Sequence, residues 1–159
     1  MKPIHHLQTM AFTYQEICQG EEPWVALGNF MNDWFDYKKD RRPELVATSL
    51  SLPERWTDEQ FHWAVFCAAS VEYLCGRYGV SCPSWVYNPV YHLPEPWFDA
   101  PMAHKPEVRE WLIQDTPEPF TRRNVYCGNR MFNNKWEVAE QYAPIFARRR
   151  FGASGASAP

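Results

Sequence analysis

Hydrophobic residues recur at helical spacing in several segments of the chain. The clearest segment spans about 57–78, where Thr57 and Gln60 form a capping box and Gly79 stands where a C-terminal cap is expected. Between these caps, residues 61–69 are apolar nearly all round. Such a pattern is typical of a helix that neighbours cover on several sides. We therefore predict a central helix over about 57–78 that forms the hub of the core.

Weaker helical patterns flank this segment. Thr13 and Glu16 also have capping-box spacing, so a short helix is predicted to begin at Thr13 and to stop at Gly20. Pro23 suits a first helical position, and the hydrophobic residues after it predict an amphipathic helix over roughly 23–38. Further helices are predicted over 43–49, from Pro106 to about Asp115, from Thr116 and Pro117 onward, and from Asn134 to Arg148, with a short extended segment over 125–127.

Residues 80–106 form a different kind of segment, in which six prolines alternate with aromatic residues. Proline removes a backbone donor and prevents a regular helix, whereas large aromatic side chains are stabilised by burial. A long ordered loop that lies over the helical core satisfies both demands. Loops of this length are uncommon and often functional.

Together these patterns predict a mainly α fold, a single-domain helical bundle around the central helix. The chain has 159 residues and 16% aromatic residues, enough for one sizeable core. We assign 1–150 to one helical domain. The small, polar end over 151–159 is predicted to be a flexible tail.

Charge and targeting signals limit the partners and the cellular location that we predict for the protein. The net charge is −3, with 7 basic and 13 acidic residues in 1–100 (−6) and 9 and 6 in 101–159 (+3). This balance argues against nucleic acid as a partner, because non-specific binding to nucleic acid depends on clustered cations. The first residues contain no apolar signal-peptide core, and no stretch reaches the length of a membrane span. We therefore predict a cytoplasmic protein with reduced thiols and no membrane association.

Five cysteines leave an enzyme or metal protein open as an alternative. Cys67, Cys75 and Cys82 are separated by seven and six residues, unlike the close pairs of zinc sites. Cys127 has arginines on both sides, and nearby cations favour a reactive thiolate. No histidine lies within twenty residues of Cys127 to act as its base. The sequence therefore predicts no cofactor, no metal and no catalytic residue.

Two arginines beside aromatic residues make the best binding candidate. The planar guanidinium groups of Arg122 and Arg123 suit carboxylate or phosphate groups. The alternative is that they pair with internal acids such as Asp99 or Glu118. The full set of candidate binding residues is Trp85, Tyr91, Trp97, Arg122, Arg123, Asn124 and Arg130.

Four stretches of tryptophan and proline landmarks carry a resemblance, namely residues 23–30, 83–85, 96–98 and 116–125. They resemble an uncharacterised family of bacterial proteins over roughly 22–135. The last three are also similar to a helical domain that follows helix-turn-helix units in some bacterial regulators of the antitoxin type. The resemblance implies a partner-binding domain, one that neutralises a toxin. The chain departs from the regulators in lacking a helix-turn-helix segment ahead of residue 57.

The leading hypothesis is a non-enzymatic protein-binding module, regulatory or antitoxin-like, whose partner is a toxin or a regulator. Its loop over 80–106 and its Arg122–Arg123 segment would face that partner, because aromatic residues and arginine anchor interfaces. A small metal-binding or cysteine-dependent enzyme is the first alternative. A nucleic-acid-binding accessory protein is the second, and a homodimer stays open.

Overall fold

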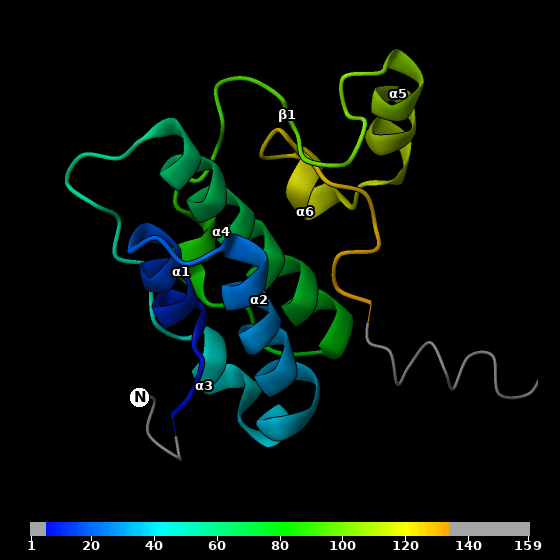
Figure 1. Ribbon diagram of the computed structural model, residues 1–159. Helices are drawn as coiled ribbons and strands as arrows, with labels where there is room; N and C mark the ends of the chain where they lie inside the picture. Colours follow the sequence, from blue (N-terminus) through cyan, green and yellow to red (C-terminus); the bar gives the residue numbers. More distant parts are fainter. Residues whose placement is uncertain (1–5, 134–159) are drawn as a thin grey trace, which may run out of the picture. The chain divides into compact units, whose positions relative to one another are not determined.

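The chain is mainly helical and is built around one central apolar helix, as predicted (Figure 1). The computed structural model describes residues 6–133. The predicted helix over 134–148 and the predicted tail over 151–159 lie outside the described residues. The chain divides into two compact units, Met1–Asn129 and Arg130–Pro159, and the elements below belong to the first.

The first helix, α1 (Met10–Cys18), begins earlier than predicted. Its N-cap is Thr9, whose side chain accepts a hydrogen bond from the Phe12 amide. Thr13 lies inside the helix, and its hydroxyl donates to the Thr9 carbonyl at 2.8 Å. The capping box predicted at Thr13 is therefore wrong. Either Thr9 or Thr13 could cap the N-terminus of this helix. Capping by Thr9 makes the helix about one turn longer.

The predicted helix over 23–38 is present but changes register. It consists of α2 (Pro23–Asn32), capped by the Glu22 side chain, and of the π-helical turn η1 (Asp33–Tyr37). A short 3-10 turn, η2 (Lys39–Arg41), and helix α3 (Arg42–Val46) follow.

The central helix α4 (Asp58–Tyr78) has the predicted ends. The capping box of Thr57 and Gln60 is formed, and Gly79 closes the helix in the left-handed region at φ +68°. Every residue over 63–71 is buried. The helix packs against α1, α6 and the turn η3, which confirms it as the hub of the core.

Aromatic rings join the other elements to α4. Trp24 of α2 meets Trp63 and Phe66 edge-on, at ring-centroid distances of 5.9 and 5.6 Å. Trp97 of the long loop meets Trp63 at 5.2 Å, and Phe120 of α6 meets Phe66 at 5.4 Å. Aromatic residues therefore supply much of the packing around α4.

The segment over 80–106 is the predicted ordered loop. It contains η3 (Ser84–Tyr87) and the two-residue strand β1 (Trp97–Phe98), which pairs in parallel with β2 (Val125–Tyr126). Backbone hydrogen bonds hold it to the chain after α6, and three of them run from the Leu93, Trp97 and Asp99 amides to the carbonyls of Arg123, Asn124 and Tyr126.

Two helices link the two strands. Helix α5 (Pro106–Asp115) has the predicted bounds, and α6 (Glu118–Thr121) follows after Thr116 and Pro117. The Thr116 hydroxyl accepts from the Gly128 amide at 2.8 Å instead of capping α6. This bond ties the start of α6 to the end of the β2 segment.

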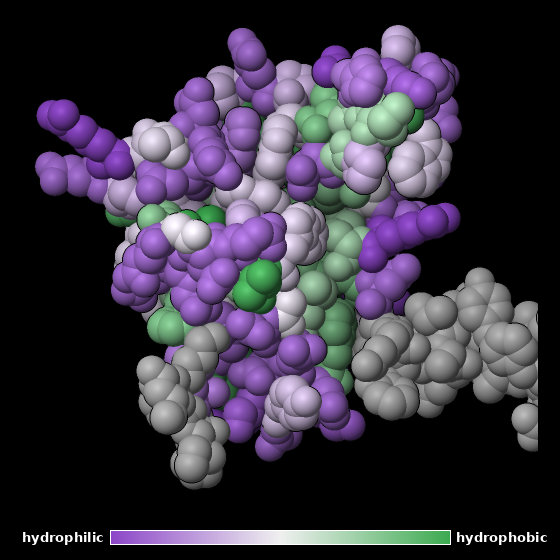
Figure 2. All heavy atoms as spheres, in the orientation of Figure 1, coloured by the Kyte–Doolittle hydropathy of each residue, from purple (hydrophilic) through white to green (hydrophobic). Residues whose placement is uncertain are grey.

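The face in Figure 2 is largely hydrophilic, with hydrophobic residues in a few separate places, among them the region beside α5. Trp111 and Ile113 of that helix are exposed to 43% and 53%. None of the helices described is both long enough and apolar enough to cross a lipid bilayer.

Candidate binding site

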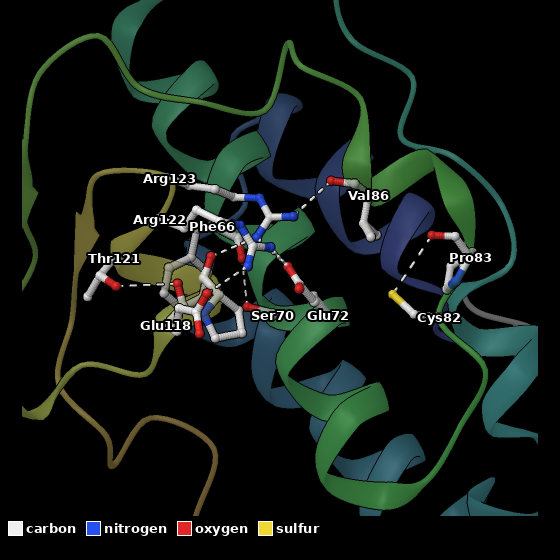
Figure 3. Close-up of polar contacts among 11 residues, drawn as sticks. Phe66, Ser70, Glu72, Cys82, Pro83, Val86, Glu118, Thr121, Arg122 and Arg123 are labelled. Carbon is white, nitrogen blue, oxygen red and sulfur yellow. Dashed lines mark hydrogen bonds and ion pairs between the residues drawn. The ribbon is translucent and has the colours of Figure 1, made fainter.

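Arg123 is buried and holds three elements together (Figure 3). One terminal nitrogen donates to the Glu72 carboxylate of α4 and to the Pro119 carbonyl of α6, both at 2.7 Å. The other donates to the Val86 carbonyl of η3 at 2.9 Å. Burying a charge is costly unless it is paired and hydrogen-bonded, and here both conditions are met. Arg123 therefore pairs with an internal acid, which was the alternative to ligand binding. The acid is Glu72.

Arg122 differs from its neighbour because 43% of its side chain is exposed. One terminal nitrogen donates a hydrogen bond to the same Glu72 carboxylate. The other reaches Glu118 only at 3.4 Å, and the Glu118 side chain is 79% exposed. The terminal nitrogen of Arg122 that faces Glu118 is therefore held only by a long, solvent-exposed contact.

The two arginines set the ionisation of Glu72. Burial acts to raise the pKa of this carboxyl, but the hydrogen bonds and charges of Arg122 and Arg123 outweigh burial, so the net shift of its pKa is downward. Glu72 therefore stays ionised at neutral pH and fixes both guanidinium groups.

A shallow hollow of about 260 Å³ lies beside these arginines. Among its aromatic side chains, Tyr87 is exposed to 55%, whereas Tyr91 is buried at 4%. The hollow is lined by Val86, Tyr87, Asn88, Pro89, Tyr91, His92, Arg122 and Arg123. We call it the Tyr87 hollow.

The structure brings three of the predicted binding residues to this hollow, namely Tyr91, Arg122 and Arg123. Trp85 packs edge-on against Tyr91, and its indole N–H donates to the Val46 carbonyl at 2.8 Å. Trp85 therefore fastens the loop to α3 and does not line the hollow.

The remaining predicted residues lie elsewhere. Trp97 stacks on His62 with ring centroids 4.7 Å apart. Asn124 adopts a left-handed backbone at φ +66°, and its side-chain amide donates to the Leu93 carbonyl. Arg130 is exposed and belongs to the second unit. Both Trp97 and Asn124 hold the long loop in place.

Two residues of this region were not predicted from the sequence. Glu72 is the only charged residue of α4 between Glu59 and Arg77, and a charged residue in such an apolar stretch is itself a signal of a specific partner. Tyr87 stands in the same proline and aromatic segment as Trp85 and Tyr91. No pattern distinguishes the exposed aromatic residue of this segment from the buried ones, because their burial depends on the path of the loop.

A second hollow, of about 430 Å³, lies where α2 and α4 begin, and Glu21, Glu22, Glu59 and Trp63 are among its lining residues. Glu22 accepts a hydrogen bond from the Val25 amide at the start of α2. Acidic residues stabilise helix N-termini. Capping therefore accounts for the charge of this hollow.

The surroundings of Cys127 disfavour the reactive thiolate that its neighbouring arginines suggest. Burial, with the nearby Asp99 charge, raises the pKa of the Cys127 thiol well above its ordinary value. A thiol in this state is a poor nucleophile. Among residues 6–133, no three histidine, cysteine, aspartate or glutamate side chains gather as potential ligands of a metal ion.

Comparison with known proteins adds no relative: no protein-family model, curated protein or solved structure matches the chain.

Proposed function

We propose that this protein is a non-enzymatic protein-binding module that binds a protein partner through the Tyr87 hollow. The observation that carries the proposal is the exposed ring of Tyr87 beside the half-exposed Arg122, on a base that the buried Arg123 makes rigid. Tyrosine and arginine are enriched among the residues that dominate binding energy at protein interfaces. A rigid base limits the entropy lost on binding.

The contacts of Arg122 support an acidic partner segment. Glu118 contacts Arg122 at only 3.4 Å and is mostly in solvent, so a partner carboxylate can replace it at little cost. The replacement would form shorter, charge-assisted hydrogen bonds with the guanidinium group. An adjacent apolar side chain of the partner would cover Tyr87. The volume of the hollow, about 260 Å³, suits one or two side chains rather than a cofactor.

The resemblance to a domain of antitoxin-type regulators suggests what the partner is. We propose an antitoxin-like or regulatory role, in which the partner is a toxin or a regulator of a bacterial system. Under this proposal the acidic segment belongs to that protein, and binding at the Tyr87 hollow blocks its activity.

Site-specific photo-crosslinking tests the surface. A photoreactive phenylalanine analogue at position 87 is compared with the same analogue at Tyr37, a tyrosine of η1 that is 70% exposed. We expect position 87 to yield one crosslinked partner in cells of the native host, and position 37 to yield none. Equal crosslinking at both positions would contradict the proposal.

Once the partner has been captured, reversing the charge of Arg122 tests whether this arginine contributes to the affinity. We expect Arg122→Glu to weaken binding at least about tenfold, which corresponds to about 1.4 kcal/mol, through repulsion of the partner's carboxylate. Arg41→Glu is the matched control, because Arg41 is 42% exposed and also pairs with a glutamate close to it in the chain, Glu44. Identical affinities for the two variants would remove Arg122 from the interface.

A further inference from the structure

Hydrogen bonds of one arginine hold the walls of the Tyr87 hollow. The Arg123 guanidinium donates to the Val86 carbonyl at 2.9 Å, which fixes the turn η3 that carries Tyr87 (Figure 3). The Arg123 carbonyl accepts at 3.1 Å from the backbone amide that follows His92. Both η3 and the segment around His92 are therefore attached to Arg123, the neighbour of Arg122 in the chain.

Four side chains of this hollow can donate a hydrogen bond to an anion. Arg122 has 43% of its side chain exposed, and Tyr87, Asn88 and His92 are exposed as well. The Asn88 side-chain oxygen already accepts from the Val90 amide at 3.0 Å, so its nitrogen is the atom that can donate to a ligand. A histidine ring keeps an N–H donor in either protonation state. Among the described residues that line the hollow, none is acidic.

This set of donors exceeds what a carboxylate can use. A carboxylate has two oxygens, and one guanidinium group can bind both of them in a bidentate pair. A phosphate monoester has three terminal oxygens and carries about −1.5 to −2 charges at pH 7. The donors beside Arg122 can bind the additional oxygen, and His92 comes from the segment that is attached there. The hollow therefore matches a phosphate better than a carboxylate.

We propose that the Tyr87 hollow binds a phosphorylated side chain of the partner, and that Arg122 and His92 hold the phosphate. Arg122 gives up its 3.4 Å contact with Glu118 and binds an acidic group of either kind. His92 distinguishes the two kinds, because its N–H reaches the oxygen that a carboxylate lacks. The inference rests on the proposed function and narrows the acidic group of the partner to a phosphate monoester.

The size of the hollow favours a phosphate carried by a protein over a free metabolite. Its volume of about 260 Å³ is below the roughly 300–1,000 Å³ of pockets that enclose small molecules. It is also shallow, so a side chain that protrudes from a partner's surface can enter it while the partner's backbone stays outside.

The backbone around the hollow is already ordered. The Tyr91 amide donates to the Asn88 carbonyl at 3.0 Å, which closes the turn over Pro89. The Trp85 ring packs edge-on against Tyr91 below that turn. Binding therefore has to order only the exposed ends of side chains, and this limits its entropic cost.

Peptide binding followed by tyrosine NMR tests the preference for phosphate without the partner. Ring-labelled tyrosine reports on the hollow, and Tyr87→Phe assigns the signal. We expect a short alanine peptide with one phosphoserine to bind at least about fivefold more tightly than the same peptide with glutamate, through the added hydrogen bond and charge. Equal affinities for the two peptides would overturn the proposal.

Variants with matched controls separate the roles of the two residues. His92→Ala should abolish the preference and leave the affinity for the glutamate peptide nearly unchanged, whereas Arg122→Gln should weaken binding of both peptides. His104→Ala and Arg41→Gln replace an exposed histidine before α5 and a 42% exposed arginine, and both should bind as the wild type does. A preference that survives in His92→Ala would overturn the proposal.

Crosslinking from position 87 then tests whether the partner carries the phosphate. Lysate of the native host is treated with a broad-specificity protein phosphatase, and lysate with the inactivated enzyme is the control. We expect the active enzyme to remove most of the crosslinked partner. Crosslinking that dephosphorylation leaves unchanged would overturn the phosphorylated partner while the proposed interface stands. A lack of any crosslinked partner in the control would instead overturn the proposed interface, while a peptide preference for phosphate would still stand.

Discussion

Arg122 and Arg123 are neighbours in the chain, but their surroundings differ enough that their removal should have very different costs. We expect Arg123→Met to lower the free energy of unfolding by about 3 kcal/mol, because the buried carbonyls of Val86 and Pro119 lose their donor. Arg122→Ala should cost less than about 1 kcal/mol, since water screens this half-exposed group. Urea unfolding measures both values. Equal losses would contradict the internal role of Arg123.

Part of this site can be predicted from the sequence. Two adjacent arginines beside aromatic residues indicate either a binding site or internal pairing with an acid. The sequence did not distinguish the two residues, and it did not reveal Glu72, which lies 50 residues before Arg122. A contact of this range is set by the packing of α6 on α4, and no local pattern records that packing.

Asp99 should make stability depend on pH in a defined direction. Burial raises the pKa of this carboxyl, and the nearby charge of His62 only partly opposes the shift of its pKa. A raised pKa in the folded state favours folding below the unfolded value of about 3.9, and this contribution is lost as pH rises through the folded pKa. We therefore expect Asp99→Asn to unfold at higher urea concentration than the wild type at pH 7. The gain should vanish below about pH 3.9. A gain of the same size at both pH values would exclude burial of the charge as its cause.

At the scale of elements, two glycines at the C-terminal end of α4, one inside the helix and one in its cap, should respond to alanine in opposite ways. Gly79 has φ +68° in the C-terminal cap, and Gly76 lies within the helix; a Cβ atom would meet nothing at either position. Gly79→Ala should cost roughly 1–2 kcal/mol for the left-handed backbone. Gly76→Ala should stabilise by about 0.5–1 kcal/mol, because alanine loses less backbone entropy in a helix. Thermal unfolding followed by circular dichroism measures both, and a change of the same sign would contradict the cap.

Elements whose ends carry local chemistry were predictable, and those set by tertiary contacts were not. The capping box and Gly79 gave both ends of α4, and Pro106 gave the start of α5. The π-helical turn η1 was not predicted. Within it, the Trp34 carbonyl accepts from the Arg42 side chain at 2.9 Å, and the Arg42 guanidinium lies over the Trp34 ring. Such a bond depends on the return of the chain through α3.

At the scale of the molecule, the aromatic rings connect parts of the chain that local hydrogen bonds do not. Trp24 and Trp97 come from segments more than seventy residues apart, and both contact Trp63. The long loop is joined to the helical core by these rings and by the backbone bonds to the chain after α6. Loss of the loop would expose the same rings that cover α4. The loop and the helices should therefore unfold together.

This coupling predicts a single unfolding transition. Seven of the eight tryptophans lie within the described residues, and Trp136→Phe leaves these seven as the only indoles. In that variant we expect tryptophan fluorescence and far-ultraviolet circular dichroism to give the same urea midpoint, since coincident probes are the mark of two-state unfolding. A fluorescence transition at lower urea than the helical signal would mean that the loop leaves the helices first. The Tyr87 hollow would then lack its rigid base, because the loop supplies Tyr87 and α4 supplies Glu72.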